Sequence, residues 1–411
     1  MRALDVWLYG RRAGRLEQAR GTLRFAYADD YRSASGPPLS WSLPVDSAVD
    51  ERAAATFFAN LLPEGEIRTL VARRFGVSAG NDFGLLYEIG GDCAGAVTLL
   101  PPDSEPGGGT RGATVRWLDE DALAADLADL PRRPLLADPE EGVRLSLAGA
   151  QDKLPVVVDG DRIGVPLRGA PSTHIIKTAI TRFEDTVANE AFCLALAREI
   201  GLSAARATID RAGEREFLLV ERYDRRHVDG RVERVHQEDF CQALAVPPEL
   251  KYQREGGPGF QDCFAVLREV SAGTAADVIA LLDAATLSLL IGNHDAHAKN
   301  LSLLHPERGG SRLAPLYDLV STAVYAGLDR KLAMAIGGEY RPEYLRRRHV
   351  ERFAAEAGLG PAAARRRMLD VTRRTRTAAP AVAERIGPRP VLDRIVATVG
   401  ERAALLEREL S

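Results

Sequence analysis

Asp295 and Asn300, separated by four residues, stand in a polar loop that follows the apolar segment 278–290. This D-x-x-x-x-N spacing is typical of loops that transfer phosphoryl groups. A carboxylate can orient an attacking hydroxyl group and accept its proton, and an amide oxygen can bind Mg²⁺ without adding a full charge. The same residue types are also common in turns and at helix caps, so the pattern alone leaves both interpretations open.

A second acid, Asp318, follows at a position that supports the chemical interpretation. Short apolar stretches at 300–304 and 313–318 flank the turn 306–311. They predict a hairpin that returns Asp318 to the loop, which is the order in which kinases place their catalytic base and their metal-binding aspartate.

Three segments upstream have features of a nucleotide site. Residues 144–153 are rich in small side chains, which lets backbone N–H groups approach a phosphate, but they lack the known glycine motifs and fit a plain hairpin equally well. Lys177 lies in the predicted strand 173–178, where it could pair with phosphates or remain solvated. The buried strand 216–224 ends in polar residues, as expected at a hinge whose backbone could bind adenine.

The segment 189–201 predicts a helix with an Asn cap at its start and a terminal glycine. Glu190 would then lie in the first turn. It could pair with Lys177, but the helix dipole already favours an acid there, and we expect the dipole to be the reason. From residue 237 onward the pattern is mainly helical.

Composition limits the class of protein. The chain has 411 residues, of which 45% are hydrophobic and 27% charged, and a net charge of −4 implies no general attraction to nucleic acid or membranes. Residues 341–411 hold 16 Arg against 9 acids, either on solvated helix faces or in a basic patch. Four cysteines lack metal-ligand spacing. Because we see neither a signal peptide nor an apolar run suited to a bilayer, we expect a cytoplasmic protein.

Lysine is used sparingly. Of 54 basic residues only five are lysines, which suggests positions where a compact, rotatable ammonium group is needed: Lys153, Lys177, Lys251, Lys299 and Lys331.

Taken in order, these segments resemble the HipA family, the serine/threonine kinase toxins of bacterial HipBA toxin–antitoxin modules. The matching stretches span nearly the whole chain: 40–44, 57–63, 95–99, 146–153, 173–177, 220–226, 237–242, 251–252, 256–259, 297–300 and 316–318. The resemblance implies an α+β protein with a two-lobed protein-kinase-like fold, an additional N-terminal α+β subdomain and an all-helical C-terminal lobe. The expected boundaries are 1–102 for the N-terminal subdomain, 103–240 for the small lobe and 241–411 for the helical large lobe.

The resemblance also implies residue roles. Asp295 would be the catalytic base, and Asn300 and Asp318 would hold Mg²⁺. ATP would be bound by Lys177, Glu221, Tyr223, Asp224, Gln237, His297 and Lys299. The phosphate loop would comprise Leu147, Ala148, Gly149, Ala150, Gln151, Asp152 and Lys153. Ser146, at its edge, would be autophosphorylated to switch the enzyme off, since the added charge would expel the loop.

The implied cofactors are ATP and Mg²⁺. The implied partners are an inhibitory HipB-like helix-turn-helix antitoxin that ties the kinase to operator DNA, and a protein substrate, an aminoacyl-tRNA synthetase and most of all glutamyl-tRNA synthetase. Two alternatives stay open: a small-molecule phosphotransferase, because aminoglycoside and choline kinases share a D-x-H-x-x-N loop, and a catalytically silent corepressor. His294, where the family has a small residue, and a shortened segment around 325–331 depart from the family pattern and leave substrate docking open.

Overall fold

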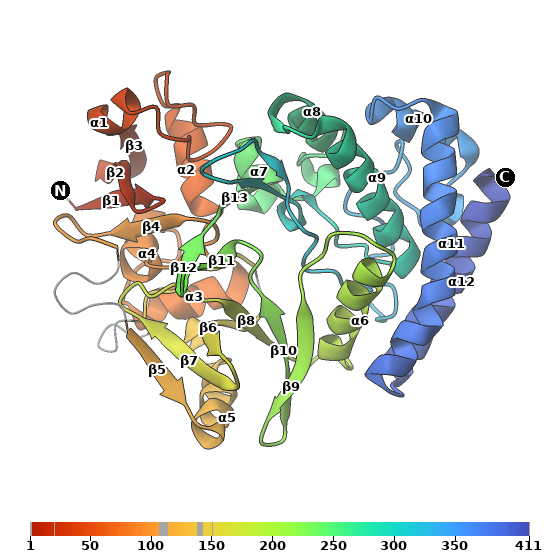
Figure 1. Ribbon diagram of the computed structural model, residues 1–411, viewed down its shortest axis with the longest axis horizontal. Helices are drawn as coiled ribbons and strands as arrows, with labels where there is room; N and C mark the ends of the chain where they lie inside the picture. Colours follow the sequence, from red (N-terminus) through yellow and green to blue (C-terminus); the bar gives the residue numbers. More distant parts are fainter. Residues whose placement is uncertain (1, 20, 107–113, 138–142, 150, 411) are drawn as a thin grey trace.

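The computed structural model describes residues 2–19, 21–106, 114–137, 143–149 and 151–410. Figure 1 shows the N-terminal unit and a strand-rich lobe side by side, with the helices of the C-terminal part on the other side of the molecule. These three groups of elements follow the predicted order of subdomain, small lobe and large lobe, and the mixed α+β, kinase-like architecture is confirmed.

The N-terminal unit is a four-stranded antiparallel sheet with strand order β3-β2-β1-β4 and four helices. The edge strand β3 alternates exposed and buried side chains, as expected for a strand with one solvated face. The elements are β1 (Ala3–Leu8), β2 (Arg11–Ala19), β3 (Thr22–Tyr27), β4 (Val97–Leu100), α1 (Asp29–Ser33), α2 (Glu51–Ala59), α3 (Gly65–Arg74) and α4 (Asp82–Ile89).

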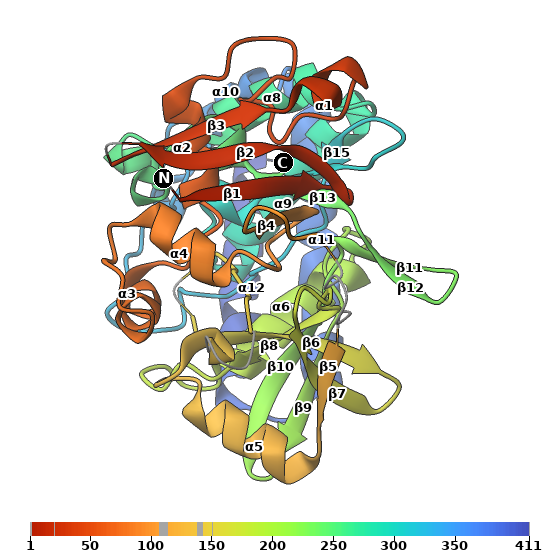
Figure 2. The same cartoon turned by 90° about the vertical axis from the view of Figure 1, so that its left-hand side faces the viewer.

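The small lobe is built on a six-stranded sheet with strand order β5-β7-β6-β8-β10-β9. A hairpin leaves the end of β10 and projects from the molecule (Figure 2). The elements are β5 (Thr114–Leu118), α5 (Glu120–Asp129), η2 (Pro134–Leu136), β6 (Lys153–Asp159), β7 (Arg162–Leu167), β8 (His174–Thr178), α6 (Thr186–Glu199), β9 (Ala207–Ala212), β10 (Arg215–Glu221), and the hairpin strands β11 (Arg225–Val228) and β12 (Arg231–Arg234).

The N-terminal unit and the small lobe share one hydrophobic core. Leu4 and Val6 of β1 belong to the same buried cluster as Leu154 of β6 and Ile176 of β8. The helix α6 belongs instead to the core of the large lobe, where it packs against the C-terminal helices. The boundaries at 102 and 240 stay predictions, but packing crosses both of them.

The large lobe is helical apart from a three-stranded sheet, β13-β14-β15, so the prediction of an all-helical lobe is wrong in this detail. The predicted helical pattern at 237–244 begins as a strand, and the predicted strand 313–318 shrinks to two residues at its start. The elements are β13 (His236–Asp239), α7 (Phe240–Ala243), η3 (Pro248–Leu250), η4 (Gln253–Glu255), α8 (Phe260–Val270), α9 (Thr274–Ile291), η5 (Ala298–Asn300), β14 (Ser302–His305), β15 (Arg312–Leu313), η6 (Pro342–Tyr344), α10 (Arg347–Glu356), α11 (Pro361–Ile386) and α12 (Pro390–Leu410).

Contrary to our expectation, α9 is long and apolar enough to cross a membrane by length and composition alone. Most of it is buried inside the protein, where it packs against α8, α11 and α12. The position of α9 at the centre of the large lobe therefore accounts for its apolar length. The polar loop that contains Asp295 follows directly after its C-terminal end.

Many arginines of the C-terminal helices form ion pairs. Their partners lie on other helices or on the small lobe, in the pairs Arg367–Asp283, Arg376–Glu407, Arg385–Glu199, Arg389–Glu216 and Arg394–Glu184. This pairing favours helix faces over a basic patch, although the faces are not simply solvated, because three of these pairs join the C-terminal segment to residues 184–216.

Candidate active site

The polar loop begins at a glycine that the fold requires. Gly292 ends α9 with a φ of 72°, in the left-handed region that favours glycine. A side chain there would also collide with Ala323, since an added Cβ would lie 2.5 Å from the Ala323 Cβ. The chain can therefore turn sharply out of the buried helix, and Asp295 reaches solvent.

Asp295 is held in place through its backbone. Its N–H group donates to Oδ1 of Asn293 at 3.1 Å, and its carbonyl oxygen accepts from Nδ2 of Asn300 at 3.1 Å. Desolvation by the surrounding loops raises the pKa of Asp295 above its ordinary value, and the negative charge of Asp318 adds to this increase. A carboxylate with an increased pKa is a better proton acceptor, as general-base chemistry requires.

Lys177 lies between two acids. Its Nζ is 2.6 Å from Oε1 of Glu190 and 2.7 Å from Oδ1 of Asp318. Lys177 lowers the pKa of Asp318 far below its ordinary range, so Asp318 is ionised. Burial alone would lower the pKa of Lys177, but the two carboxylates raise it above its ordinary value.

The structure corrects our interpretation of Glu190. The helix α6 begins at Thr186, not at Asn189, so Glu190 lies beyond the first turn and faces Lys177. Its side chain is 3% exposed. The ion pair, and not the helix dipole alone, therefore accounts for an acid at this position.

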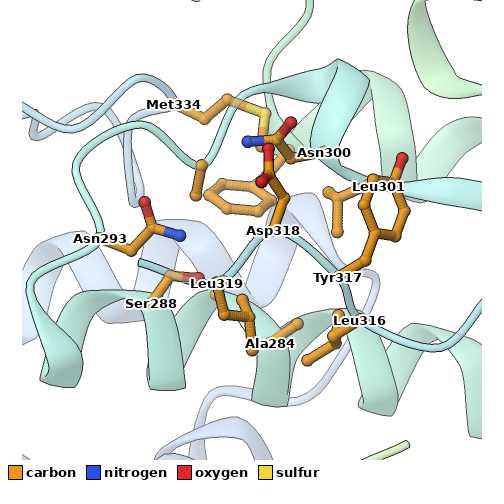
Figure 3. A pocket seen from close by; sticks show the side chains of 13 residues that line it. Ala284, Ser288, Asn293, Asn300, Leu301, Leu316, Tyr317, Asp318, Leu319 and Met334 are labelled. Atoms are coloured by element: carbon orange, nitrogen blue, oxygen red, sulfur yellow. The ribbon is translucent and has the colours of Figure 1, made fainter. Parts of the chain in front are cut away.

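The two predicted magnesium ligands come together. Figure 3 shows the Asn300 amide beside the Asp318 carboxylate among the residues that line a small pocket, which also include the apolar Leu319 and Met334. The described residues contain no group of three or more His, Cys, Asp or Glu side chains suited to a metal. One carboxylate and one amide fit Mg²⁺, which usually completes its octahedron with water and substrate phosphates.

The phosphate loop folds against the start of α3. Gly149, with a φ of 105°, accepts a hydrogen bond from the Glu64 N–H group at 3.1 Å, and Lys153 donates to the Ala148 carbonyl. Burial, together with the positive charge of nearby Lys177, lowers the pKa of Lys153 to about 8. Lys153 is therefore an ammonium group that a phosphate would readily stabilise.

The other predicted loop residues surround this turn. Leu147 is buried, Gln151 donates to the Thr178 carbonyl at 3.1 Å, and burial raises the pKa of Asp152. Ala150 lies outside the described residues.

Ser146 is fully buried at the base of the loop. Its hydroxyl group donates to the Leu61 carbonyl at 2.8 Å, and its N–H group donates to the Asp92 carbonyl at 3.0 Å. Ser146 is therefore bonded to the N-terminal unit at two points, and a kinase could reach its hydroxyl only after the loop opens.

The hinge residues separate into two groups. Glu221 is exposed, and the N–H group of Tyr223 donates to no acceptor among the described residues, so it is available to adenine. Asp224 is different. It is buried, and its carboxylate accepts from Arg222 at 2.7 Å, from Arg225 at 2.9 Å and from the Gly95 N–H group at 2.7 Å. Its occupied carboxylate does not fit the predicted role of Asp224 in binding ATP.

Two further predicted side chains carry buried polar atoms that lack hydrogen-bond partners among the described residues. These atoms are Oε1 of Gln237 and Nδ1 of His297. Burial lowers the pKa of His297 to about 3, so its imidazole is neutral at ordinary pH. Unpartnered buried polar atoms are costly, so their presence agrees with the prediction that these two side chains contact a ligand.

Lys299 does not fit the prediction that it binds ATP. It is buried, and its Nζ lies 2.6 Å from Oδ1 of Asn60, 3.4 Å from Glu64 and 3.6 Å from Asp239. These contacts connect the loop of the large lobe to the N-terminal unit. Glu64 and Tyr252 also lie in this region, and we had assigned neither of them to the site.

The fold and the site define a class of protein. A lysine on a strand of the small lobe pairs with a glutamate on the next helix. On the large lobe, an aspartate loop lies beside the two predicted metal ligands. Together these are the parts expected of a two-lobed protein-kinase-like phosphotransferase.

The sequence matches the HipA-like C-terminal domain over residues 145–379 and the HipA N-terminal domain over residues 4–100. The chain belongs to the HipA family, a family of kinase toxins, and membership implies ATP-dependent phosphoryl transfer.

Individual proteins and a solved structure of the family are also similar to this chain. The putative kinase Y4mE of Sinorhizobium fredii is 47% identical over 93% of this chain and 92% of its own length. The serine/threonine-protein kinase toxin HipA of Shewanella oneidensis is 32% identical over 90% of this chain and 86% of its own length. A solved complex of HipA, HipB and operator DNA from Shewanella oneidensis contains a chain that matches with a TM-score of 0.85 and 30% identity, covering 99% of this chain and 97% of that one.

Proposed function

We propose that this protein transfers the γ-phosphoryl group of Mg·ATP to a serine or threonine hydroxyl group of another protein. The observation that carries this proposal is that Lys177, held between Glu190 and Asp318, lies at the same site as Asp295 and Asn300. Asp295 accepts the hydroxyl proton while the new O–P bond forms. The bond from the γ-phosphorus to the bridging oxygen breaks, and ADP leaves with that electron pair.

The remaining residues of the site bind and orient the nucleotide. Lys177 and the phosphate loop face the phosphates, and the backbone of Tyr223 binds the adenine. Gln237 and His297 contribute the polar atoms that lack partners within the described residues. Mg²⁺ held by Asn300 and Asp318 would neutralise charge that develops on the phosphates.

We further propose that the kinase is the toxin of a toxin–antitoxin pair in the cytoplasm. Support comes from the similarity to HipA of Shewanella oneidensis, which is a toxin and is found in a complex with HipB and operator DNA. A HipB-like antitoxin would inhibit this chain and connect it to DNA. The proposed protein substrate is an aminoacyl-tRNA synthetase, glutamyl-tRNA synthetase first, and autophosphorylation of Ser146 would switch the kinase off.

Two variants test the proposed chemistry, each compared with the wild type by calorimetric Mg·ATP binding and by phosphate transfer from radiolabelled ATP to proteins of a bacterial lysate. Asp295→Ala should bind Mg·ATP as the wild type does and transfer no phosphate, because the base acts on the acceptor hydroxyl. Asp318→Ala should bind ATP more weakly, and added magnesium should strengthen its binding less.

The same assay separates the alternatives. Normal phosphate transfer by Asp295→Ala would contradict the assignment of the base. Phosphate found on small molecules of the lysate but on no protein would indicate a small-molecule phosphotransferase. ATP binding without any transfer by the wild type would indicate a silent corepressor.

A further inference from the structure

Tyr252 contacts the proposed base although it lies far from the polar loop in sequence. Its hydroxyl group donates a hydrogen bond to Oδ1 of Asp295 at 2.8 Å. Tyr252 and its neighbour Lys251 lie between η3 and η4, in a part of the chain to which the roles assigned so far give no function. The hydrogen bond engages only one of the two carboxylate oxygens of Asp295, so the two oxygens are no longer equivalent.

The backbone bonds of Asp295 do not determine where its carboxylate points. Asn293 and Asn300 fix the N–H group and the carbonyl oxygen, but the side chain can still rotate. The bond from Tyr252 removes this freedom. It occupies Oδ1, and Oδ2 has no hydrogen-bond partner in the described part of the chain, so Oδ2 is the oxygen left to accept a proton.

Tyr252 is itself held from two sides. Its ring lies edge-on to the imidazole of His297, with the ring centres 5.3 Å apart and an interplanar angle of 84°. Next to it, Lys251 forms an ion pair with Glu64 at 2.8 Å, and the side chains of both residues are less than a fifth exposed. A partly buried ion pair of this kind holds the segment in one position better than a solvated one would.

Glu64 brings the N-terminal unit into this arrangement. It is the residue immediately before α3, and its N–H group donates to Gly149 of the phosphate loop at 3.1 Å. Its carboxylate faces Lys251 and, at 3.4 Å, Lys299 of the polar loop. One acid therefore contacts the phosphate loop, the segment that holds the base and the loop that carries the base.

We propose that Tyr252 is a positioning residue that directs Oδ2 of Asp295 toward the acceptor hydroxyl group, and that the Glu64–Lys251 ion pair keeps Tyr252 in place. The inference rests on the proposed function, because it assumes that Asp295 accepts the proton. It assigns to the N-terminal unit a part in catalysis, since Glu64 lies outside both lobes of the kinase.

The test is Tyr252→Phe, which keeps the ring against His297 and removes only the hydroxyl group. Radiolabelled ATP is the donor, dephosphorylated casein is the acceptor, and self-phosphorylation is followed by intact mass. We expect kcat to fall about tenfold, the effect of losing one charge-assisted hydrogen bond that acts in the transition state. The KM for ATP and the Mg·ATP dissociation constant should not change. Tyr344→Phe, at a tyrosine that is 50% exposed, is the matched control and should behave as the wild type.

Glu64→Gln supplies a second and independent variant. It removes the charge that pairs with Lys251, so kcat should fall, as we expect for Tyr252→Phe. In a Tyr252→Phe background the same change should lower kcat little further, because both residues act through one bond and their effects should not add. Glu66→Gln, at an exposed acid in the first turn of α3, is the control.

Each outcome decides between the explanations. A wild-type kcat in folded Tyr252→Phe would overturn the inference. A loss of ATP affinity and thermal stability in Tyr252→Phe that parallels the loss of kcat would also overturn the inference, because it would show a merely structural role of Tyr252. Additive effects of the two variants would separate Glu64 from Tyr252. If Asp295→Ala transferred phosphate normally, the proposed function itself would fail, whatever the result for Tyr252.

Discussion

At the scale of single residues, the two ion pairs of Lys177 differ in their exposure to solvent. The Glu190 side chain is 3% exposed, whereas that of Asp318 is 41% exposed. In the proposed function, metal-bound phosphates would reach Asp318 and compete for Lys177, while the buried pair with Glu190 keeps the ammonium group in position. Lys177 would then have one permanent partner and one that a nucleotide displaces.

Lys177→Met should leave Glu190 buried without a partner. Removing one member of a buried ion pair costs roughly 3–5 kcal/mol, so the free energy of unfolding should fall by about that amount at neutral pH. Burial raises the pKa of Glu190 above its ordinary value even with Lys177 present, and more so without it. A carboxyl group whose pKa increases on folding destabilises the folded state as the pH rises. The loss of unfolding free energy in Lys177→Met relative to the wild type should therefore be smaller at low pH than at neutral pH.

Chemical denaturation of Lys177→Met at several pH values measures this effect, with Lys331→Met as a control at a partly exposed lysine. A deficit that is independent of pH would mean that Glu190 is not the group responsible.

At the scale of elements, helices and strands with regular hydrophobic patterns could be predicted, and those that form only through pairing or bonding with other elements could not. The strand β2 contains three arginines and few apolar residues, and it forms because β1 and β3 pair with it on both sides. The start of α6 was misplaced because Asp185, which precedes it, adopts a left-handed conformation and makes no side-chain capping bond. Asn189, which looks like a cap, instead bonds to Ser321 and Tyr325.

The residues of the candidate site also divide into those that the sequence could predict and those that it could not. The spacing in the polar loop placed Asp295 and Asn300, and the predicted hairpin brought Asp318 back to them. The contacts of Asp224 with Gly95 and of Lys299 with Asn60 could not be foreseen, because these two partners come from the N-terminal unit, more than a hundred residues away. Tyr252 carried no local signal except its place in a stretch that resembles the family, and Glu64, just beyond the stretch 57–63, carried none.

The hinge is held by a buried network of charges that joins it to the N-terminal unit. Asp92, 1% exposed, accepts from Arg225 at 3.0 Å, from Arg234 at 2.8 Å and from the hydroxyl group of Ser172 at 2.6 Å. Although burial alone would raise its pKa, the arginines lower the pKa of Asp92 far below its ordinary value. The network therefore stabilises the folded state only while Asp92 is ionised.

Asp92→Asn should lower the free energy of unfolding by about 3 kcal/mol at pH 7, since it leaves buried arginines short of a partner. An acid whose pKa is lowered on folding contributes stability above its unfolded pKa, and this contribution is lost as the pH falls through the folded pKa. The difference between Asp92→Asn and the wild type should therefore narrow in acid. Thermal melts from pH 3 to pH 7 measure it, with the exposed Asp46→Asn as control. A constant difference across this range would contradict the role of the charge.

At the scale of the whole molecule, the phosphate loop lies where the N-terminal unit meets the two lobes. Its residues bond to Leu61, Glu64 and Asp92, all from the N-terminal unit. The same unit shares its hydrophobic core with the small lobe and reaches the polar loop of the large lobe through Asn60 and Lys299. A change in the conformation of the phosphate loop should therefore alter the contacts among all three parts of the molecule.

Ser146 offers the sharpest test of this connection. Phosphorylation would add a charge of about −1.5 to −2 to a fully buried hydroxyl group and break its bond to Leu61, so the loop could not return to its place. We expect the purified chain to gain phosphate on Ser146 when incubated with Mg·ATP. The phosphorylated chain should bind ATP more weakly, and trypsin should cut it faster after Arg144, which precedes the loop, and after Lys153, its last residue.

Intact mass, peptide mapping and a digestion time course measure these three effects. Asp295→Ala incubated alone is the control and should gain no phosphate, and phosphatase treatment should restore both ATP binding and resistance to trypsin. Ser146→Ala would be a poor control, because it also removes the bond to Leu61. A preparation that phosphorylates other proteins but never carries phosphate on Ser146 would rule out this off-switch, and so would a phosphorylated chain that binds ATP and resists trypsin as before.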